Sequence, residues 1–178
     1  LTVNSGSFDA NDTIVLAGSR TISVAATDSV SITTGSVSAS VSQTTGNTAT
    51  VNAAALADNT LLTLTGAGTF SVSDLSGDVN ASGTTGSVTV ASVGDVSVTT
   101  GSGATSISAA SGKTATVNAN TLADNASLST SGAGSFTITG LTGDLTNSAT
   151  GTVQVTLEDD GGSASTTVTN NAASGTMT

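Results

Sequence analysis

The chain repeats itself, with residues 48–80 recurring sixty-six positions downstream as residues 114–146. The first segment reads TATVNAAALADNTLLTLTGAGTFSVSDLSGDVN, and the second reads TATVNANTLADNASLSTSGAGSFTITGLTGDLT. Eighteen of the 33 aligned positions are identical, and most of the others exchange similar residues, such as Val72 for Ile138. A period of this length predicts one structural unit stacked on itself, as in a solenoid.

The long repeat contains shorter ones. Residues 68–78 resemble residues 86–95 at an offset of about 18, and residues 30–36 match residues 96–102 at an offset of 66. Residues 18–24, however, match residues 66–72 at an offset of 48. The first copy has therefore lost about 18 residues, and a solenoid can lose one whole coil and keep stacking. These offsets predict four coils in each long repeat, each of about 17 residues.

We predict a single repetitive domain over residues 1–178, with a truncated copy at about 1–47 and full copies at 48–113 and 114–178. Because the chain begins at Leu1, without Met or a signal-like segment, we expect it to be a fragment of a larger protein.

Apolar and hydroxyl residues alternate with period two along the chain. In Phe70-Ser-Val72 and Phe136-Thr-Ile138, the apolar side chains would face one side and the hydroxyl the other, as in a half-buried strand. Gly, Asn and Asp residues, which favour sharp turns, separate these segments. The pattern predicts an all-β fold, a parallel β-solenoid of about ten coils of about 17 residues, each with two or three strands. Phe8, Phe70 and Phe136 would be the largest core residues.

The composition favours a narrow core. Aromatic residues make up 2% of the chain and charged residues 8%, and there is no Pro to interrupt a ladder of strands. The abundance of Val, Ile and Thr argues against disorder. The rival architecture is a pair of β-sandwich domains of about 90 residues each, which usually need larger core residues.

The charge and the missing residue types exclude several functions. A net charge of −10 with only two basic residues, Arg20 and Lys113, makes nucleic acid and anionic membranes improbable partners. No apolar run is long enough to predict a membrane span. The lack of His and Cys removes the usual general base and thiol chemistry, and no Trp or Tyr is present to stack on a sugar. We therefore expect no enzymatic activity.

Aspartate is the one residue type that recurs at equivalent positions and could bind a metal ion. Asp78 and Asp144 lie in the matching segments LSGD and LTGD, Asp95 lies in VGD, and Asp58 and Asp124 lie in the two LADN segments. Carboxylates stacked at the corners of coils could bind Ca²⁺ together with carbonyl and Asn oxygens. The alternative is that Gly-Asp and Asp-Asn are simply favourable corner residues, with each Asp bonding its own backbone.

Paired threonines suggest a different surface. They lie at residues 33–34, 44–45, 84–85 and 99–100 and could belong to a flat array of the kind that orders water on ice-binding solenoids. Such an array needs Thr at the same outward place on every coil, and Thr33, Thr99 and Thr156 do not recur coil by coil.

The Ser/Thr/Gly/Ala/Val/Asn/Asp composition, the low isoelectric point of about 4.1 and segments such as GAGTFSVSDLSGD and TTGSVTVASVGD resemble the repetitive regions of large bacterial extracellular proteins. These are filamentous surface adhesins, giant proteins exported by type I secretion, and surface-layer proteins. The resemblance implies a secreted, structural protein at the bacterial cell surface that associates with identical subunits, often with Ca²⁺. A module that binds carbohydrate, ice or a host receptor is the alternative.

Overall fold

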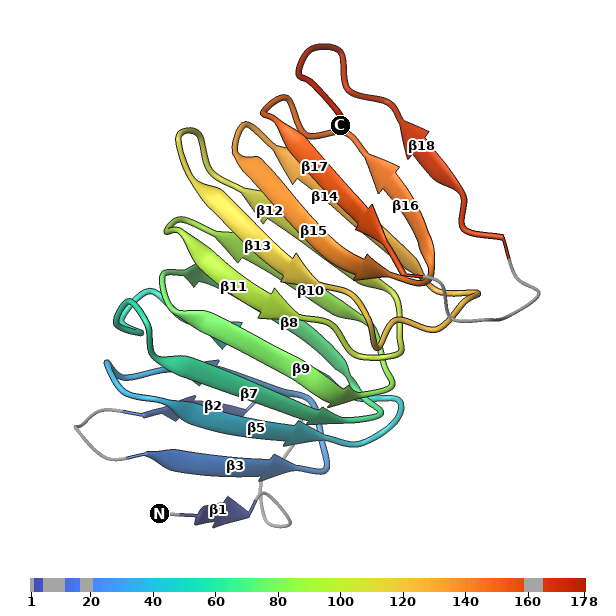
Figure 1. Cartoon of the computed structure of the whole chain (residues 1–178). Coiled ribbons are helices and arrows are strands. Elements are labelled where there is room, and N and C mark those ends of the chain that lie inside the picture. The colour runs from blue at the N-terminus through green and yellow to red at the C-terminus, as the bar shows by residue number, and fades with distance from the viewer. Residues whose placement is uncertain (1, 5–11, 17–20, 159–164) are drawn as a thin grey trace.

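The computed structural model describes residues 2–4, 12–16, 21–158 and 165–178. The regular structure of these residues is entirely β-strand, in two sheets of nine strands each. The chain forms a stack that ascends from the N-terminal to the C-terminal strands (Figure 1). Phe8, which we expected in the core, lies outside the described residues.

Odd-numbered strands form sheet A and even-numbered strands form sheet B. Sheet A contains, in spatial order, β1 (Thr2–Asn4), β3 (Ile22–Ala26), β5 (Ala39–Gln43), β7 (Leu61–Gly66), β9 (Asp78–Thr84), β11 (Val96–Thr99), β13 (Thr114–Asn118), β15 (Ser135–Leu141) and β17 (Val153–Leu157). Sheet B contains β2 (Asp12–Val15), β4 (Val30–Thr33), β6 (Thr48–Asn52), β8 (Thr69–Leu75), β10 (Val88–Ser92), β12 (Thr105–Ala109), β14 (Ser127–Gly132), β16 (Asp144–Asn147) and β18 (Val168–Asn170).

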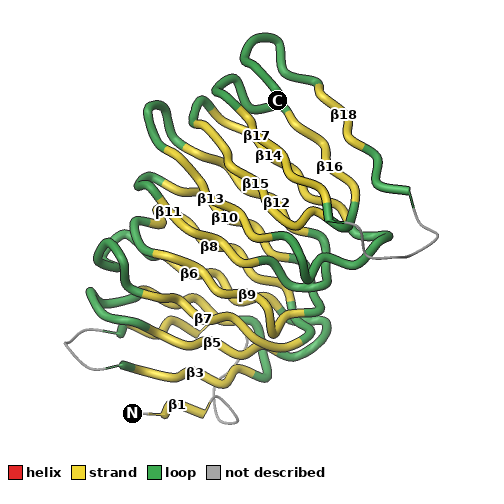
Figure 2. Tube along the Cα trace, in the orientation of Figure 1, coloured by secondary structure: helices red, strands yellow, loops and turns green. Residues whose placement is uncertain are grey.

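Every strand pairs in parallel with the strand two places along the chain. The chain passes from sheet A to sheet B and back, so that each coil contributes one strand to each sheet (Figure 2). The result is a β-solenoid, as the alternation and the repeat predicted, and it has about eight turns. The rival pair of β-sandwiches is excluded, because sandwiches are built from antiparallel strands.

The coils are longer and fewer than predicted. Val24, Val41 and Leu64 occupy one register position on three successive coils of sheet A, although the second of these steps along the chain is clearly longer than the first. The mean separation is about 19 residues, instead of the predicted 17, and the turns number about eight instead of ten. The strands keep their register while the connections vary in length, and strand alternation alone does not reveal how many residues each connection holds.

The 66-residue repeat corresponds to three and a half turns, not to four coils. The segment TATVN forms β6 in sheet B in the first copy and β13 in sheet A in the second, seven strands further along. An odd number of strands brings equivalent residues to opposite faces of the solenoid. The structural unit is therefore a half-turn, made of one strand and one corner. The 48-residue offset relates Val24 in β3 to Val72 in β8, which are five strands apart. The 66-residue offset spans seven strands, so the first copy lacks two strands, which is one complete turn.

The core is a thin layer between the two sheets, filled by large residues beside small ones. Phe70 is fully buried in β8 and lies in register between Ala49 and Val88. Phe136 is equally buried in β15 and lies between Ala115 and Val153 on the opposite sheet. The small Ala side chain on the preceding coil leaves room for each ring, which confirms both Phe residues as core fillers.

The two copies share an irregularity at one backbone position. Asp74 has a φ of 55° and its counterpart Gly140 a φ of 64°, and the pairing register shifts beside each of them. Gly adopts this left-handed conformation without strain, and Asp is one of the few other residues that tolerate it. The bulge therefore recurs with either residue.

One buried hydroxyl group lacks the partner that its counterpart has. Thr34 Oγ1 is buried without a hydrogen bond among the described residues. In the second copy, the equivalent Thr100 contacts Thr121, whose Oγ1 lies 3.5 Å from Thr100 Oγ1 and also donates to the Thr100 carbonyl. Ala55 occupies the position of Thr121 in the first copy, so no hydroxyl is available to Thr34.

Truncating either Phe ring will strongly destabilise the solenoid. We expect Phe70→Ala and Phe136→Ala each to lower the free energy of unfolding by about 3–5 kcal/mol, because each leaves a cavity in a layer with little freedom to collapse. Urea denaturation followed by circular dichroism measures the change. The outward neighbour Ser71→Ala is the control and should change stability by less than about 0.5 kcal/mol. Losses well below this range for the Phe variants would contradict the core assignment.

Supplying the missing hydroxyl will stabilise the first copy. We expect Ala55→Thr to raise the free energy of unfolding by about 1 kcal/mol, the usual net value of a hydrogen bond. In a Thr34→Val background the gain should be smaller, because only the bond to the backbone carbonyl of residue 34 remains, and a double-mutant cycle isolates the contribution of the two hydroxyls. Ala54→Thr, at the exposed neighbouring position, is the matched control. An equal gain in both backgrounds would show that the hydroxyl of Thr34 is not involved.

Candidate functional site

The chain turns at two edges of the solenoid, and the candidate residues lie there. Edge AB is where the chain leaves a strand of sheet A and enters sheet B, and edge BA is where it returns to sheet A. Asp58, Asp78 and Asp95 lie at edge BA, whereas Asp124 and Asp144 lie at edge AB. The half-turn repeat explains this division, because Asp124 and Asp144 are the counterparts of Asp58 and Asp78.

Three of the five aspartates bind the backbone of the next coil. Asp78 Oδ1 accepts a hydrogen bond from the Ser97 amide at 2.7 Å, and Asp95 Oδ1 accepts one from the Thr114 amide at 2.8 Å. Asp144 Oδ1 does the same for the Thr167 amide at 2.8 Å. Each carboxylate thus satisfies a backbone donor at the start of a strand, much as an N-cap residue does for a helix. The corner interpretation predicts a bond from each Asp to its own backbone, whereas the observed bonds join successive coils.

Uncharged side chains fill the same role on other coils. Ser29 Oγ accepts a hydrogen bond from the Thr48 amide, and Ser38 Oγ accepts one from the Leu61 amide, both at 3.0 Å. The requirement at this corner is therefore an oxygen acceptor, and a negative charge is not essential to it. This finding favours the corner interpretation for Asp78, Asp95 and Asp144.

The glycine before Asp78 and Asp144 is required by close packing. A Cβ on Gly77 would lie 2.6 Å from the Thr60 carbonyl oxygen and 2.8 Å from Leu56 Cδ2, and Gly143 is enclosed in the same way by Ala126 and Leu122. Leu56 and Leu122, the first residues of the two LADN segments, are buried and close the core at the edge. In the motif Leu-x-Gly-Asp, the Gly therefore leaves room for the buried leucine of the LADN segment, and the Asp that follows binds the next coil.

Residues of four successive coils line a shallow depression at edge BA. It has a volume of about 440 Å³ and is bounded by the following residues: Asp58, Asn59, Asp78, Asp95, Val96, Ser97, Thr114 and Thr116. The fold thus brings Asp58, Asp78 and Asp95 to one concave surface, although they are far apart in sequence. The wall is polar and acidic, which suits a cation or a polyhydroxylated ligand.

The described aspartates do not form a compact metal-binding cluster. No group of three or more His, Cys, Asp or Glu side chains among the described residues is arranged to hold a metal ion. One oxygen of Asp78 and one of Asp95 already accept backbone hydrogen bonds. Ca²⁺ binding by Asp58, Asp78, Asp95, Asp124 or Asp144 stays a prediction.

Lys113 makes an ion pair beside the depression. Its Nζ lies 3.7 Å from Asp95 Oδ2, with 41% and 67% of the two side chains exposed. An ion pair this exposed contributes little to stability. It does offset part of the negative charge at one end of the depression.

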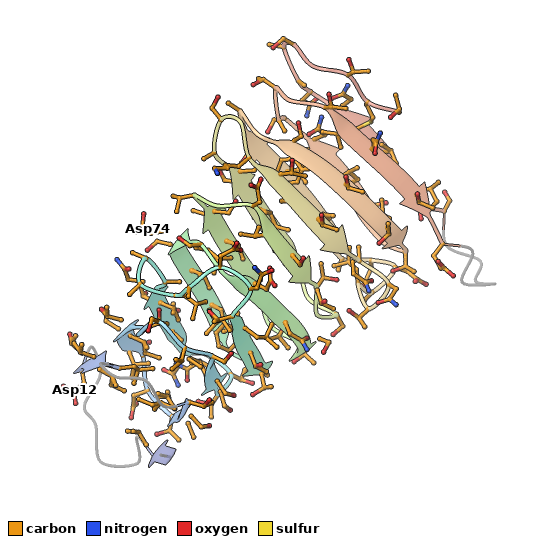
Figure 3. The ribbon with its side chains drawn as sticks, turned by 60° about the vertical axis from the view of Figure 1, so that its left-hand side comes forward. Asp12 and Asp74 are labelled. Atoms are coloured by element: carbon orange, nitrogen blue, oxygen red, sulfur yellow. The ribbon has the colours of Figure 1, made fainter. Side chains whose placement is uncertain are left out.

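Charged side chains in the described part of the chain are confined to the two edges. At edge AB are Asp12, Asp28, Asp124, Asp144 and Glu158, and at edge BA are Asp58, Asp74, Asp78, Asp95 and Lys113. The labelled Asp12 and Asp74, from opposite ends of sheet B strands, stand at the outside of the stack (Figure 3). The outward faces of the two sheets lie between these charged edges.

Sheet B presents a continuous column of hydroxyl side chains that sequence reasoning missed. One outward register position holds a Ser or Thr on all nine strands: Thr13, Ser31, Thr50, Ser71, Thr89, Ser106, Ser129, Thr146 and Thr169. The stretches of chain between neighbouring members are unequal, shorter from Thr89 to Ser106 than from Ser106 to Ser129, so no fixed period reveals the column. Sheet A has a mixed column instead, in which Asn80 and Asn118 interrupt the hydroxyls.

The paired threonines do not form this column. Thr34, Thr84 and Thr100 are buried, and the pairs to which they belong lie where strands end at the edges. A Thr array built from these pairs is therefore excluded.

Comparisons with protein-family models, with curated proteins and with solved structures found no match to this chain. Among the described residues, the structure contains no helix of the length and apolar character needed to cross a membrane.

Replacing Asp78 will separate the corner role from a metal-binding role. We expect Asp78→Ala to lower the free energy of unfolding by about 1 kcal/mol, as for the loss of an N-cap acceptor, and Asp78→Asn to keep most of the stability because its amide oxygen still accepts the bond. Thermal unfolding should be measured with excess Ca²⁺ and with chelator. If the role is the corner bond alone, chelation leaves the melting temperature of the wild type unchanged. A fall on chelation that Asp78→Asn abolishes would instead establish a Ca²⁺ site.

Proposed function

We propose that this chain is a non-enzymatic structural repeat that forms a rigid rod or a lattice component at a bacterial cell surface, as in a surface layer or a fibrous adhesin stalk. The observation that carries the proposal is the unbroken parallel pairing of nine strands in each of two sheets. Within the described part of the chain, residues far apart in sequence do not build one deep site. The same element is repeated along an axis, as expected of a protein that acts as a rigid spacer or structural rod.

The stacking supports mechanical stiffness. Each coil is bonded to the next by two sets of main-chain hydrogen bonds, one in each sheet, and the corner side chains of Asp78, Asp95 and Asp144 add further bonds between coils. At about 4.8 Å per coil, the stack is about 40 Å long. Bending it requires several of these bonds to distort together.

The surface chemistry supports association between like copies. Both faces are covered mainly by hydroxyl and amide side chains, which do not repel one another, and the charges stand at the edges. A face of this kind fits another flat polar face better than it fits a strongly charged ligand. Self-association and an extracellular location are part of this proposal.

A second candidate function, ligand binding, is favoured by the depression at edge BA. Its carboxylate, amide and hydroxyl groups offer hydrogen-bond acceptors and donors to a saccharide or to a polar group of a host receptor. Binding of a glycan array by the wild-type chain that is lost in both Asp78→Asn and Asp95→Asn would support this function. Asp144→Asn, at the opposite edge, is the matched control.

Location on the cell tests the structural proposal directly. We expect antibodies against this chain, detected by electron microscopy on the cells that produce it, to label the outer surface at a regular spacing. Extraction of the labelled layer should release the chain in assemblies larger than one copy. Labelling confined to the cell interior would contradict the proposal, and sparse surface labelling without regular spacing would favour ligand binding.

A further inference from the structure

The two faces and the two edges of the solenoid differ in charge. The ten described Asp, Glu and Lys side chains stand at the edges. Apart from Asp144 at the start of β16 and Asp74 at the bulge of β8, the outward register positions of β4 to β16 in sheet B carry Ser, Thr, Asn and Ala. The net charge is −10, so two copies that approach edge to edge meet like charges. Two copies that approach face to face keep these charges apart.

The face of sheet B is the more regular of the two. Its nine-member hydroxyl column places a small side chain that both donates and accepts a hydrogen bond about every 4.8 Å along the stack. A second outward column, two residues further along each strand, is mixed: it includes Thr33, Ser73, Ser108 and Ser131, but also Val15, Asn52 and Ala91. The corresponding column of sheet A lacks this regularity, because Asn80 and Asn118 interrupt it on either side of Thr99.

The area of sheet B is sufficient for an interface between two copies. Nine strands at about 4.8 Å, each with about five residues of about 3.3 Å, make a face of about 40 by 17 Å. Two such faces in contact would bury about 1,300 Å² in total, at the lower end of the range of specific interfaces, about 1,200–2,000 Å². The hydroxyl groups could pair across such an interface without burying a charge.

We propose that sheet B is the surface through which two copies of this chain associate face to face, about a two-fold axis near β10. The inference rests on the proposed structural function and adds to it the partner and the face. Because β10 is the central strand of sheet B, Thr89 lies near the axis and meets the same region of the second copy. Higher ionic strength should strengthen the association, since salt screens the repulsion between the acidic edges.

Analytical ultracentrifugation of charge variants tests the face. Thr89→Lys places two like charges at the centre of the proposed interface, and we expect it to weaken the association constant at least tenfold. Thr99→Lys, near the middle of sheet A, has the same chemistry on the opposite face and should leave the constant within twofold. Both residues point outward from the core, so circular dichroism and urea midpoints should show that both variants fold.

Single cysteines test the geometry independently, because the native chain has none. A short bismaleimide should cross-link Thr89→Cys into dimers at concentrations that leave Thr99→Cys, and Ser111→Cys at edge BA, monomeric. Dimers that form through Thr99→Cys or Ser111→Cys would overturn the proposal for sheet B while leaving a self-associating structural protein. A chain that labels the cell surface but stays monomeric at all concentrations and salts would overturn this inference alone. A monomer in which Thr89→Lys abolishes binding to a glycan probe would assign sheet B to a saccharide instead.

Discussion

Backbone hydrogen bonding between successive coils is the interaction on which the rest of this structure depends. A chain with so few large apolar residues cannot build a deep core, and its buried peptide groups must still find partners. Parallel stacking provides them, because each strand pairs with the strand one coil below and the strand one coil above. The narrow core then needs only one to three apolar side chains per strand. The largest core side chains are Phe70 and Phe136, each beside an Ala on the preceding coil.

The half-turn is the unit that the sequence repeats, which explains several features that are otherwise unrelated. Seven half-turns separate the two long copies, so Phe70 and Phe136 lie in opposite sheets and the LADN loops project from opposite edges. A repeated segment can form a strand in either sheet, because both sheets have the same requirements. These are inward side chains at alternate positions, a hydrogen-bond acceptor at the start of the strand, and a connection that returns the chain to register. The two copies are not equivalent at Thr34. Its counterpart Thr100 has Thr121 as a partner, whereas Ala55 at the corresponding position offers Thr34 no hydroxyl.

The distribution of charge links this architecture to the proposed role. Acidic residues suit the corners, where Asp78, Asp95 and Asp144 each bind an amide of the next coil. The strand positions that face outward hold mainly Ser, Thr and Asn: the β-branched Thr suits a strand, and Asn80 and Asn118 each bind a backbone amide two residues further on. The molecule therefore has two neutral faces between two acidic edges. In the proposed structural role, that arrangement would steer like copies toward contact through their faces, the geometry needed for a lattice or a bundle of rods.

The sequence by itself determined the class of fold: period-two alternation, a long self-similar unit and the absence of Pro predicted a β-solenoid, and the 48-residue offset predicted the loss of one coil. It also identified Phe70 and Phe136 as core residues and the Gly-Asp pairs as corners. The length of each coil, the three and a half turns per repeat and the face on which each residue lies were decided only by the tertiary structure. The physical reason is that strand pairing tolerates connections of different length, so that a short coil from β3 to β5 is followed in register by a longer one from β5 to β7. Spacing along the chain therefore does not report position on the stack, and the hydroxyl column of sheet B and the grouping of Asp58, Asp78 and Asp95 appear only when the coils are set in register.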